Sequence, residues 1–230
     1  MPVLNPTVSG QITSIVSPTH AGARDASSGT FNGSSSRYAS AIKYSKVAGI
    51  RANTFNVTRY FIEFDTSGIS VTPVSADLSL YGFFNNSADF FAVKATFSDG
   101  SIGNADFDSI DGWSAGADNS SNVTKYSAEV ETFSTSGFND IALNSTALSD
   151  MASVDNFKIC LIQAENDLAN VEATATPTTG LWRTFNTIHL DYTAGSAAGY
   201  THKVLGVAAG SIGKVKSVAT ANIGKVNSVD

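Results

Sequence analysis

The sequence predicts an all-β protein: a two-sheet β-sandwich, most simply a jelly roll, followed by a short repetitive C-terminal tail. The 230 residues include 31 Ser, 22 Thr and 19 Gly, and only 15% of them are charged. These small polar residues are weak helix formers and suit short strands joined by many turns. At least eight short stretches alternate apolar and polar residues, and the last thirty residues contain an 11-residue repeat.

Alternation with a period of two is typical of strands that have one buried face. In 58–64, for example, it sets Tyr60 and Ile62 against Arg59 and Phe61. Two sheets of such strands pack their inner faces into a core about 10 Å thick. The predicted strands are 11–16, 58–64, 76–83, 90–97, 125–133, 140–143, 156–163 and 187–192. A short helix is expected at 145–151, and a single helical turn is possible at 106–110.

Composition excludes several classes of protein. The net charge of −6 and a pI near 4.9 argue against a nucleic-acid partner. No apolar run approaches the roughly 20 residues of a membrane span, so no membrane partner is expected. The opening MPVLNPTVSGQITS lacks a basic start and a continuous apolar stretch, so we expect no secretion signal. Cys160 is the single cysteine, which excludes an intrachain disulfide and a cysteine-based zinc site.

Charge divides the chain into two parts. Residues 1–200 carry 10 basic and 19 acidic side chains, a net charge of −9, whereas residues 201–230 carry four lysines and one acid, a net charge of +3. A basic segment after an acidic one indicates two parts with different roles. We therefore expect a jelly-roll domain at 1–200 and a basic repeat tail at 201–230.

The tail repeats an 11-residue unit, because VAAGSIGKVKSV is followed by ATANIGKVNSVD. Thirty residues with so few apolar side chains should not fold alone, so copies of the tail or a host surface must cover them. The period also suits a right-handed helical supercoil, but the glycines and β-branched residues favour extended structure. A disordered charged terminus is a third alternative. The residues predicted to oligomerise or attach are Val204, Val207, Ile212, Lys214, Val215, Val218, Ile223, Lys225, Val226 and Val229.

One stretch resembles a known family. Residues 59–81, RYFIEFDTSGISVTPVSADLSLY, are similar to the strand–turn–strand signature of the DNRLRE-type β-sandwich module, in which an arginine-led strand runs into Phe-Asp, a small turn and a segment of the form "sA.L.Ly". Stretches at 138–144, 157–168 and 189–195 agree with the same layout. The matching residues are Arg59, Phe64, Asp65, Ile69, Ser75, Ala76, Leu78, Leu80 and Tyr81. They are core and turn residues, so the resemblance implies the fold more than the function.

The resemblance implies two settings. Such modules are similar to carbohydrate-binding domains of secreted bacterial proteins, and they also occur in bacteriophage virion proteins. The C-terminal repeat resembles tails on marine bacteriophage structural proteins, including proposed fibres and decoration proteins. The lack of a recognisable secretion signal favours the virion. The resemblance then implies a homo-oligomer, a trimer in the family setting, that contacts capsid or tail proteins.

Catalytic patterns are weak in this chain. Its three histidines, His20, His189 and His202, fall in a predicted loop, a predicted strand and the tail. No HExxH metalloprotease motif and no GxGxxG nucleotide-binding loop occurs. We therefore expect a protein that is not an enzyme, and a calcium-dependent glycan hydrolase is the least favoured hypothesis.

One segment has carboxylates at a spacing that suits a structural calcium ion. No other cofactor is expected. Asp106, Asp108 and Asp111 lie within NADFDSIDGW, and carboxylates at such spacing suit Ca²⁺. The segment lacks the glycine and the bidentate glutamate of an EF-hand loop. Capping of turns by aspartate side chains is the alternative. Glu165 with Asp167 forms a second, weaker candidate.

Aromatic side chains that are exposed beside polar groups would suit a glycan. Trp113 follows a glycine in a polar loop, and Trp182 precedes Arg183, whose guanidinium can donate to a sugar hydroxyl. Tyr81 and Phe90 are further candidates. The alternative is that these residues pack in the core or at an interface, as large aromatic residues more often do.

The favoured hypothesis is thus a non-enzymatic virion structural protein, a head decoration or a fibre component, assembled through its C-terminal repeats. The alternative is a carbohydrate-binding module that recognises surface glycans.

Overall fold

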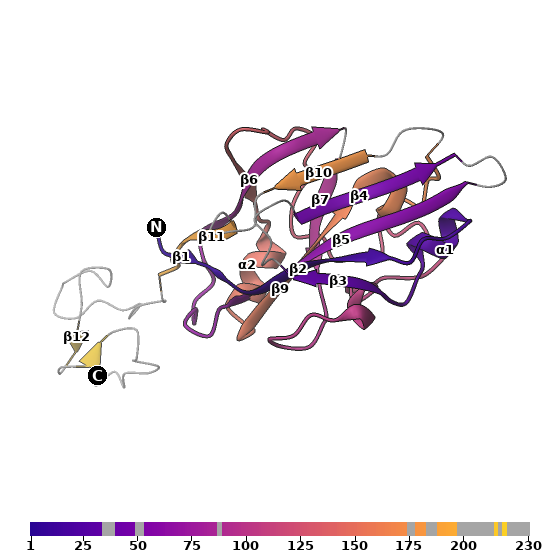
Figure 1. Ribbon diagram of the computed structural model, residues 1–230. Coiled ribbons are helices and arrows are strands. Elements are labelled where there is room, and N and C mark those ends of the chain that lie inside the picture. The colour runs from indigo at the N-terminus through magenta and orange to yellow at the C-terminus, as the bar shows by residue number, and fades with distance from the viewer. Residues whose placement is uncertain are drawn as a thin grey trace.

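The computed structural model describes residues 1–33, 40–48, 53–86, 89–173, 178–182, 188–196, 214–215 and 218–219. The chain forms antiparallel β-sheets that pack into a sandwich (Figure 1). The strands of the sandwich are β1 (Val3–Leu4), β2 (Pro6–Ser14), β3 (Gly29–Gly33), β4 (Ser40–Val47), β5 (Thr54–Asp65), β6 (Ser75–Asn86), β7 (Phe90–Lys94), β8 (Phe138–Ala142), β9 (Asn156–Gln163), β10 (Thr178–Trp182) and β11 (Ile188–Thr193). The helices are α1 (His20–Arg24), η1 (Asn104–Asp106), α2 (Ser145–Met151) and the π-helical turn η2 (Ala164–Leu168).

The two sheets share strand β6. In the smaller sheet, the first half of β6 pairs with β8 on one side and with β11 on the other, and β11 also pairs with β1. The second half of β6 pairs with β10 and so joins the larger sheet. There, β5 is central: β2 lies along one edge, while β4 and β9 share the other. The predicted all-β sandwich is confirmed in this form.

The first core lies between the two sheets. It joins one face of β5, β7 and β9 to the inner face of β6, β8 and β11, with Met151 of α2 closing one end. Leu78 and Leu80 of β6 meet Tyr60, Ile62 and other side chains of this face, and all four are fully buried. This contact matches the alternation in the sequence, because residues i and i+2 of a strand share a face.

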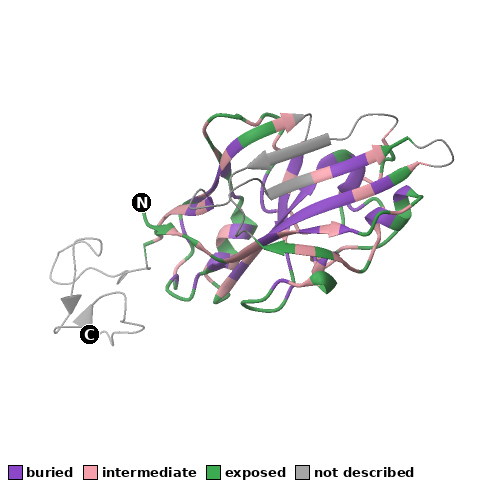
Figure 2. Cartoon of the chain, viewed as in Figure 1, coloured by how far each residue is buried: buried purple, intermediate pink, exposed green. Residues whose placement is uncertain are grey.

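The second core lies on the opposite face of the larger sheet. Phe61 of β5 and Cys160 of β9 pack there beneath Phe97, Phe107 and other residues of the long connection between β7 and β8, and α1 closes the same layer. Figure 2 shows the buried stretch that consequently runs along β5. The expectation that this strand has a single buried face is therefore wrong. Alternation predicted an exposed face because Arg59 and Glu63 are polar, but both side chains are buried.

Most predicted elements are confirmed, with shifted ends. Strand β9 and helix α2 have the predicted bounds, and Asn144 caps α2 by accepting a hydrogen bond from the backbone N–H of Ala147 at 3.1 Å. The predicted strand 125–133 is wrong. This segment follows the edge of β7 through isolated bridges only, and the Ser127 hydroxyl accepts the Ala92 N–H at 3.0 Å, in place of a backbone partner.

The tail is described at two short places. Lys214–Val215 (β12) and Val218–Ala219 (β13) pair as antiparallel strands, with Lys214 opposite Ala219 and Val215 opposite Val218. Extended rather than helical structure is thus found in one repeat. No helix in the described part of the chain is long and apolar enough to span a membrane.

Candidate functional site

The outer face of the smaller sheet carries a cluster of rings that we call the aromatic face: Tyr81, Phe138 and His189. It forms because Tyr81 follows the buried Leu80 along β6 and so lies on the opposite face of the strand. The register then places Phe138 of β8 opposite Tyr81, and His189 of β11 opposite Ser79. Three strands that are distant in sequence thus contribute rings to one surface.

The rings of the aromatic face contact one another edge to face. The centroids of Tyr81 and Phe138 are 5.3 Å apart at an interplanar angle of 86°, and those of Phe138 and His189 are 5.2 Å apart at 67°. The Tyr81 hydroxyl donates to the Ser136 carbonyl at 3.2 Å. Phe138 nevertheless remains 49% exposed. Exposed and mutually braced aromatic rings are a suitable surface for an apolar or sugar ring.

Carboxylates flank these rings. The Asp191 carboxylate lies 3.1 Å from His189 Nε2 in β11, and the Asp140 carboxylate accepts a hydrogen bond from the Ser79 hydroxyl in β6. Each carboxylate has further lone pairs available to hydroxyl donors. The aromatic face therefore combines aromatic rings with hydrogen-bond acceptors, which suits a ligand that has an apolar face and hydroxyl donors.

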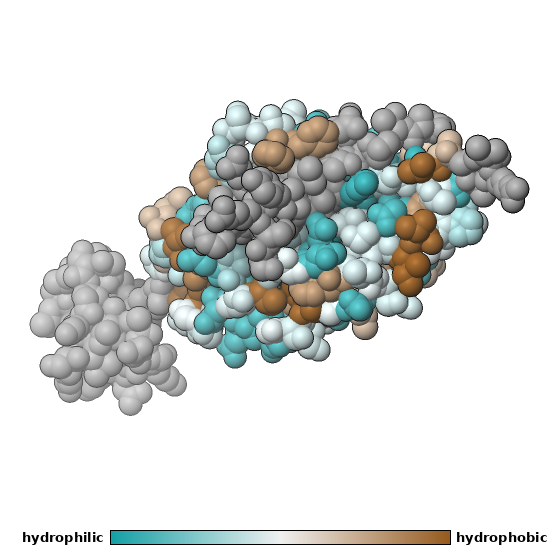
Figure 3. All heavy atoms as spheres, in the orientation of Figure 1, coloured by the Kyte–Doolittle hydropathy of each residue, from teal (hydrophilic) through white to brown (hydrophobic). Residues whose placement is uncertain are grey.

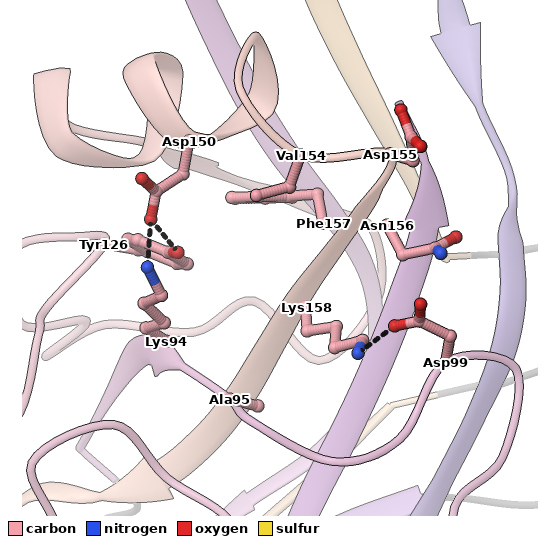
Figure 4. A pocket seen from close by; sticks show the side chains of 10 residues that line it. All are labelled: Lys94, Ala95, Asp99, Tyr126, Asp150, Val154, Asp155, Asn156, Phe157 and Lys158. Atoms are coloured by element: carbon pink, nitrogen blue, oxygen red, sulfur yellow. Dashed lines mark hydrogen bonds and ion pairs between the residues drawn. The ribbon is translucent and has the colours of Figure 1, made fainter. Parts of the chain in front are cut away.

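A second candidate is a polar cavity of about 330 Å³ near the start of β9 (Figure 4). On one side, the Asp150 carboxylate pairs with Lys94 Nζ at 2.9 Å and accepts the Tyr126 hydroxyl at 2.6 Å. On the other side, Lys158 Nζ pairs with Asp99 and donates to the Phe97 carbonyl. The charged groups that Figure 4 joins by dashed lines are thus already paired with one another.

The aromatic side chains that line this cavity present little surface. Tyr126 is 1% exposed and Phe157 is fully buried, and their rings stack at 5.0 Å. Burial and, next, the hydrogen bond to Asp150 raise the pKa of Tyr126, so this hydroxyl stays protonated and occupied. A ligand would have to displace existing ion pairs here, so we regard the aromatic face as the better site.

Trp113, predicted for glycan contact, packs against two arginines. Its ring lies 4.0 Å from the guanidinium carbon of Arg59 and 4.5 Å from that of Arg24. Arg59 in turn makes a bidentate ion pair with the buried Asp167, with nitrogen–oxygen distances of 2.7 and 2.8 Å. Trp113 therefore packs against buried side chains, which is the alternative to glycan contact that the sequence left open. Phe90, another candidate, is buried in the first core.

Of the aspartates predicted for calcium, Asp106 caps a local turn. Asp106 accepts hydrogen bonds from the Gly103 N–H at 2.8 Å and from the Ser109 hydroxyl at 3.2 Å. Asp111 accepts the Thr124 hydroxyl, and Asp108 is half-buried. The described residues contain no group of three His, Cys, Asp or Glu side chains that could hold a metal ion. The turn-capping alternative thus accounts for Asp106, and Asp167 of the weaker pair is the partner of Arg59.

Other predicted residues have no described side chain. Trp182 ends β10, but its side chain lies outside the description, and Arg183 lies outside the described residues altogether. Of the predicted tail residues, only the backbones of Lys214, Val215 and Val218 are described. The tail residues outside the described part are Val204, Val207, Ile212, Ile223, Lys225, Val226 and Val229.

The expectation that the chain has no G-x-S-x-G motif is wrong. Residues 112–116 read GWSAG, which matches the G-x-S-x-G pattern of a nucleophile elbow. That elbow requires a strand-to-helix turn, whereas Ser114 lies in a loop, with its backbone N–H and carbonyl bonded to the Asn119 side chain. This context does not support a hydrolase.

Models of known protein families and curated protein sequences give no match to the chain. The class of protein that the structure itself defines is therefore an all-β sandwich with an aromatic outer face on its smaller sheet. Of the rings in that face, the sequence predicted Tyr81 as a site residue but not Phe138 or His189. Recognising Phe138 as a neighbour of Tyr81 requires the pairing of β8 with β6.

Proposed function

We propose that the protein is a non-enzymatic structural protein of a bacteriophage virion, a head decoration or a fibre component. In this proposal residues 1–200 form a jelly-roll domain that is displayed, and residues 201–230 attach it or assemble it into a homo-oligomer, with a trimer as the expected state. Capsid or tail proteins of the virion are the expected neighbours.

The register of the C-terminal repeat supports this proposal most strongly. Among the residues whose burial the structure describes, the buried members of both core clusters lie between Ile12 and Leu190. The tail nevertheless keeps β-branched residues and lysines in an 11-residue register. A segment that retains apolar residues in register is suited to association with other copies.

Replacing Val215 and Val226 with Asp in the full-length chain is expected to reduce self-association at least tenfold, because both valines occupy equivalent places in successive repeats. Sedimentation velocity over a concentration series would measure the change. The matched control is Val74→Asp, since Val74 is 70% exposed on the sandwich itself. Equal association of the tail variant and the control would remove the assembly role of the repeats.

A second candidate function, carbohydrate binding, is supported by the aromatic face. Its rings are flanked by the Asp140 and Asp191 carboxylates, which can accept hydrogen bonds from sugar hydroxyls. This function is compatible with a virion protein that binds glycans on a surface. It would use Tyr81 and Phe138 of the aromatic face, whereas Trp113 packs against Arg24 and Arg59. The predicted Trp182 and Arg183 have no described side chain.

Phe138→Ala is expected to weaken glycan binding at least tenfold, because it removes the ring that contacts both Tyr81 and His189. A broad glycan array followed by calorimetry on the strongest ligand would measure the effect, with Val74→Ala as the control and Trp113→Ala as the test of the alternative site. No binding by the unmodified protein would exclude this function. Loss with Trp113→Ala alone would move the site away from the aromatic face.

A further inference from the structure

A groove separates the edge of β8 from the segment 127–132, and it encloses a cavity of about 430 Å³. The two segments are joined at one end, where Ser127 bridges Leu143 and the Asn144 N–H donates to the Tyr126 carbonyl at 2.8 Å. They then part, because β8 follows β6 of the smaller sheet while Val130 bridges Phe90 of β7 in the larger sheet. The groove therefore lies where the two sheets of the sandwich diverge.

The groove exposes a strand edge. Within the described part of the chain, β8 pairs with β6 along one edge, and its other edge has only the bridge just beyond its end. An edge of this kind is a template for a further strand. Val130 supplies apolar surface to the groove, whereas Ile141 is nearly buried in the first core. Ala128 and Ala142 add small side chains that leave room for a second backbone.

The groove is also strongly acidic. Glu129 and Glu131 line it and are exposed, and Asp89 and Glu165 lie close enough to interact with them. Burial and then the charge of Asp89 raise the pKa of Glu129, while Lys125 opposes this shift only in part. Among these groups negative charge thus exceeds positive charge, so a cationic partner would be stabilised here.

We propose that this groove receives one C-terminal repeat from a second copy of the chain, which adds as a strand to the edge of β8. The repeat has the complementary chemistry, because the unit Ile-Gly-Lys-Val presents β-branched residues for the apolar surface, a lysine for Glu129 and Glu131, and a glycine where the backbones approach. Its length also fits, since four residues of strand span about 13 Å and the groove follows four residues of β8. This inference rests on the proposed assembly role of the tail.

A second copy is a better occupant than the chain's own tail. Lys203, Lys214 and Lys225 recur every 11 residues, so the tail has more lysine-bearing units than one groove accommodates. The remaining units are then available to the grooves of other chains. Repeated units that each bind a neighbouring chain also increase the overall avidity, because every binding event after the first is intramolecular.

Reversing the charge of the groove tests this proposal on the full-length protein. Glu129→Lys with Glu131→Lys is expected to weaken self-association at least tenfold at 0.1 M salt, and adding Lys214→Glu with Lys225→Glu to the same chain should restore it. The association of the unmodified chain should also weaken towards 1 M salt, because the Debye length falls from about 10 to about 3 Å. The matched control is Asp155→Lys, which reverses an exposed carboxylate of the other cavity.

Each outcome separates this inference from the proposed function. If the unmodified chain does not associate, both fail. If it associates and the groove variant associates equally well, the assembly role stands and the groove proposal is wrong. Carbodiimide cross-linking of mixed ¹⁴N- and ¹⁵N-labelled chains identifies the occupant: links from Lys214 or Lys225 to Glu129 or Glu131 should join two labels. Links confined to single chains would show that each groove holds its own tail and would overturn the proposal.

Discussion

Replacing Asp167 with Asn is expected to lower the free energy of unfolding by about 3–5 kcal/mol, because it leaves a buried arginine without its counter-charge. Asp167 and Arg59 are both fully buried and form a bidentate ion pair. The Asp167 charge also favours the charged form of the neighbouring Arg24, whose pKa is lowered chiefly by burial. Without the carboxylate, two buried guanidinium groups would repel each other. Urea denaturation followed by tryptophan fluorescence would measure the loss.

The matched control for this prediction is Glu172→Gln. Glu172 pairs with Lys46 at 2.7 Å but its side chain is 49% exposed, so removing its charge should leave the denaturation midpoint unchanged. A change for Asp167→Asn as small as that of the control would mean that the buried pair does not hold α1, β5 and η2 together.

Phe61→Ala is expected to destabilise the protein by about 3–5 kcal/mol, the usual cost of deleting a buried phenylalanine ring. Phe61 is fully buried in the second core, with its ring edge-to-face against Phe97 at 5.9 Å. If this face of β5 were exposed to solvent, Phe61→Ala would lower the free energy of unfolding far less. The comparison variant is Phe83→Ala, whose side chain is 44% exposed. If both variants unfold at the same urea concentration, the second buried layer is contradicted.

Alternation of apolar and polar residues predicted much of the fold, because the apolar residues that alternate along the strands are those that line the first core. The alternation that marks 156–163 as a strand reflects Phe157, Ile159 and Leu161, which do line the core between the sheets. The same pattern failed on β5, where polar and apolar residues on the second face are buried together. Arg59 is buried because Asp167, more than one hundred residues later in the chain, neutralises it. Such a partner cannot be recognised by local alternation.

The candidate site shows the same limit. Tyr81 is recognisable as an aromatic residue on the polar face of a predicted strand. Phe138 becomes its neighbour only through the register of β8 on β6, which depends on long-range pairing. Trp113 was a candidate because of its polar loop, and its ring packs on Arg24 and Arg59 instead. Apolar side chains on the face seen in Figure 3 lie in separate patches among polar ones, so hydropathy alone does not single out a site.

Native mass spectrometry of the unmodified full-length chain at micromolar concentration tests the account most directly. The assembly proposal predicts species at whole multiples of the 23.9 kDa chain mass, with three chains as the expected state. A single species at 23.9 kDa over the whole concentration range would contradict the proposal that this protein is built into a larger assembly through its C-terminal repeats.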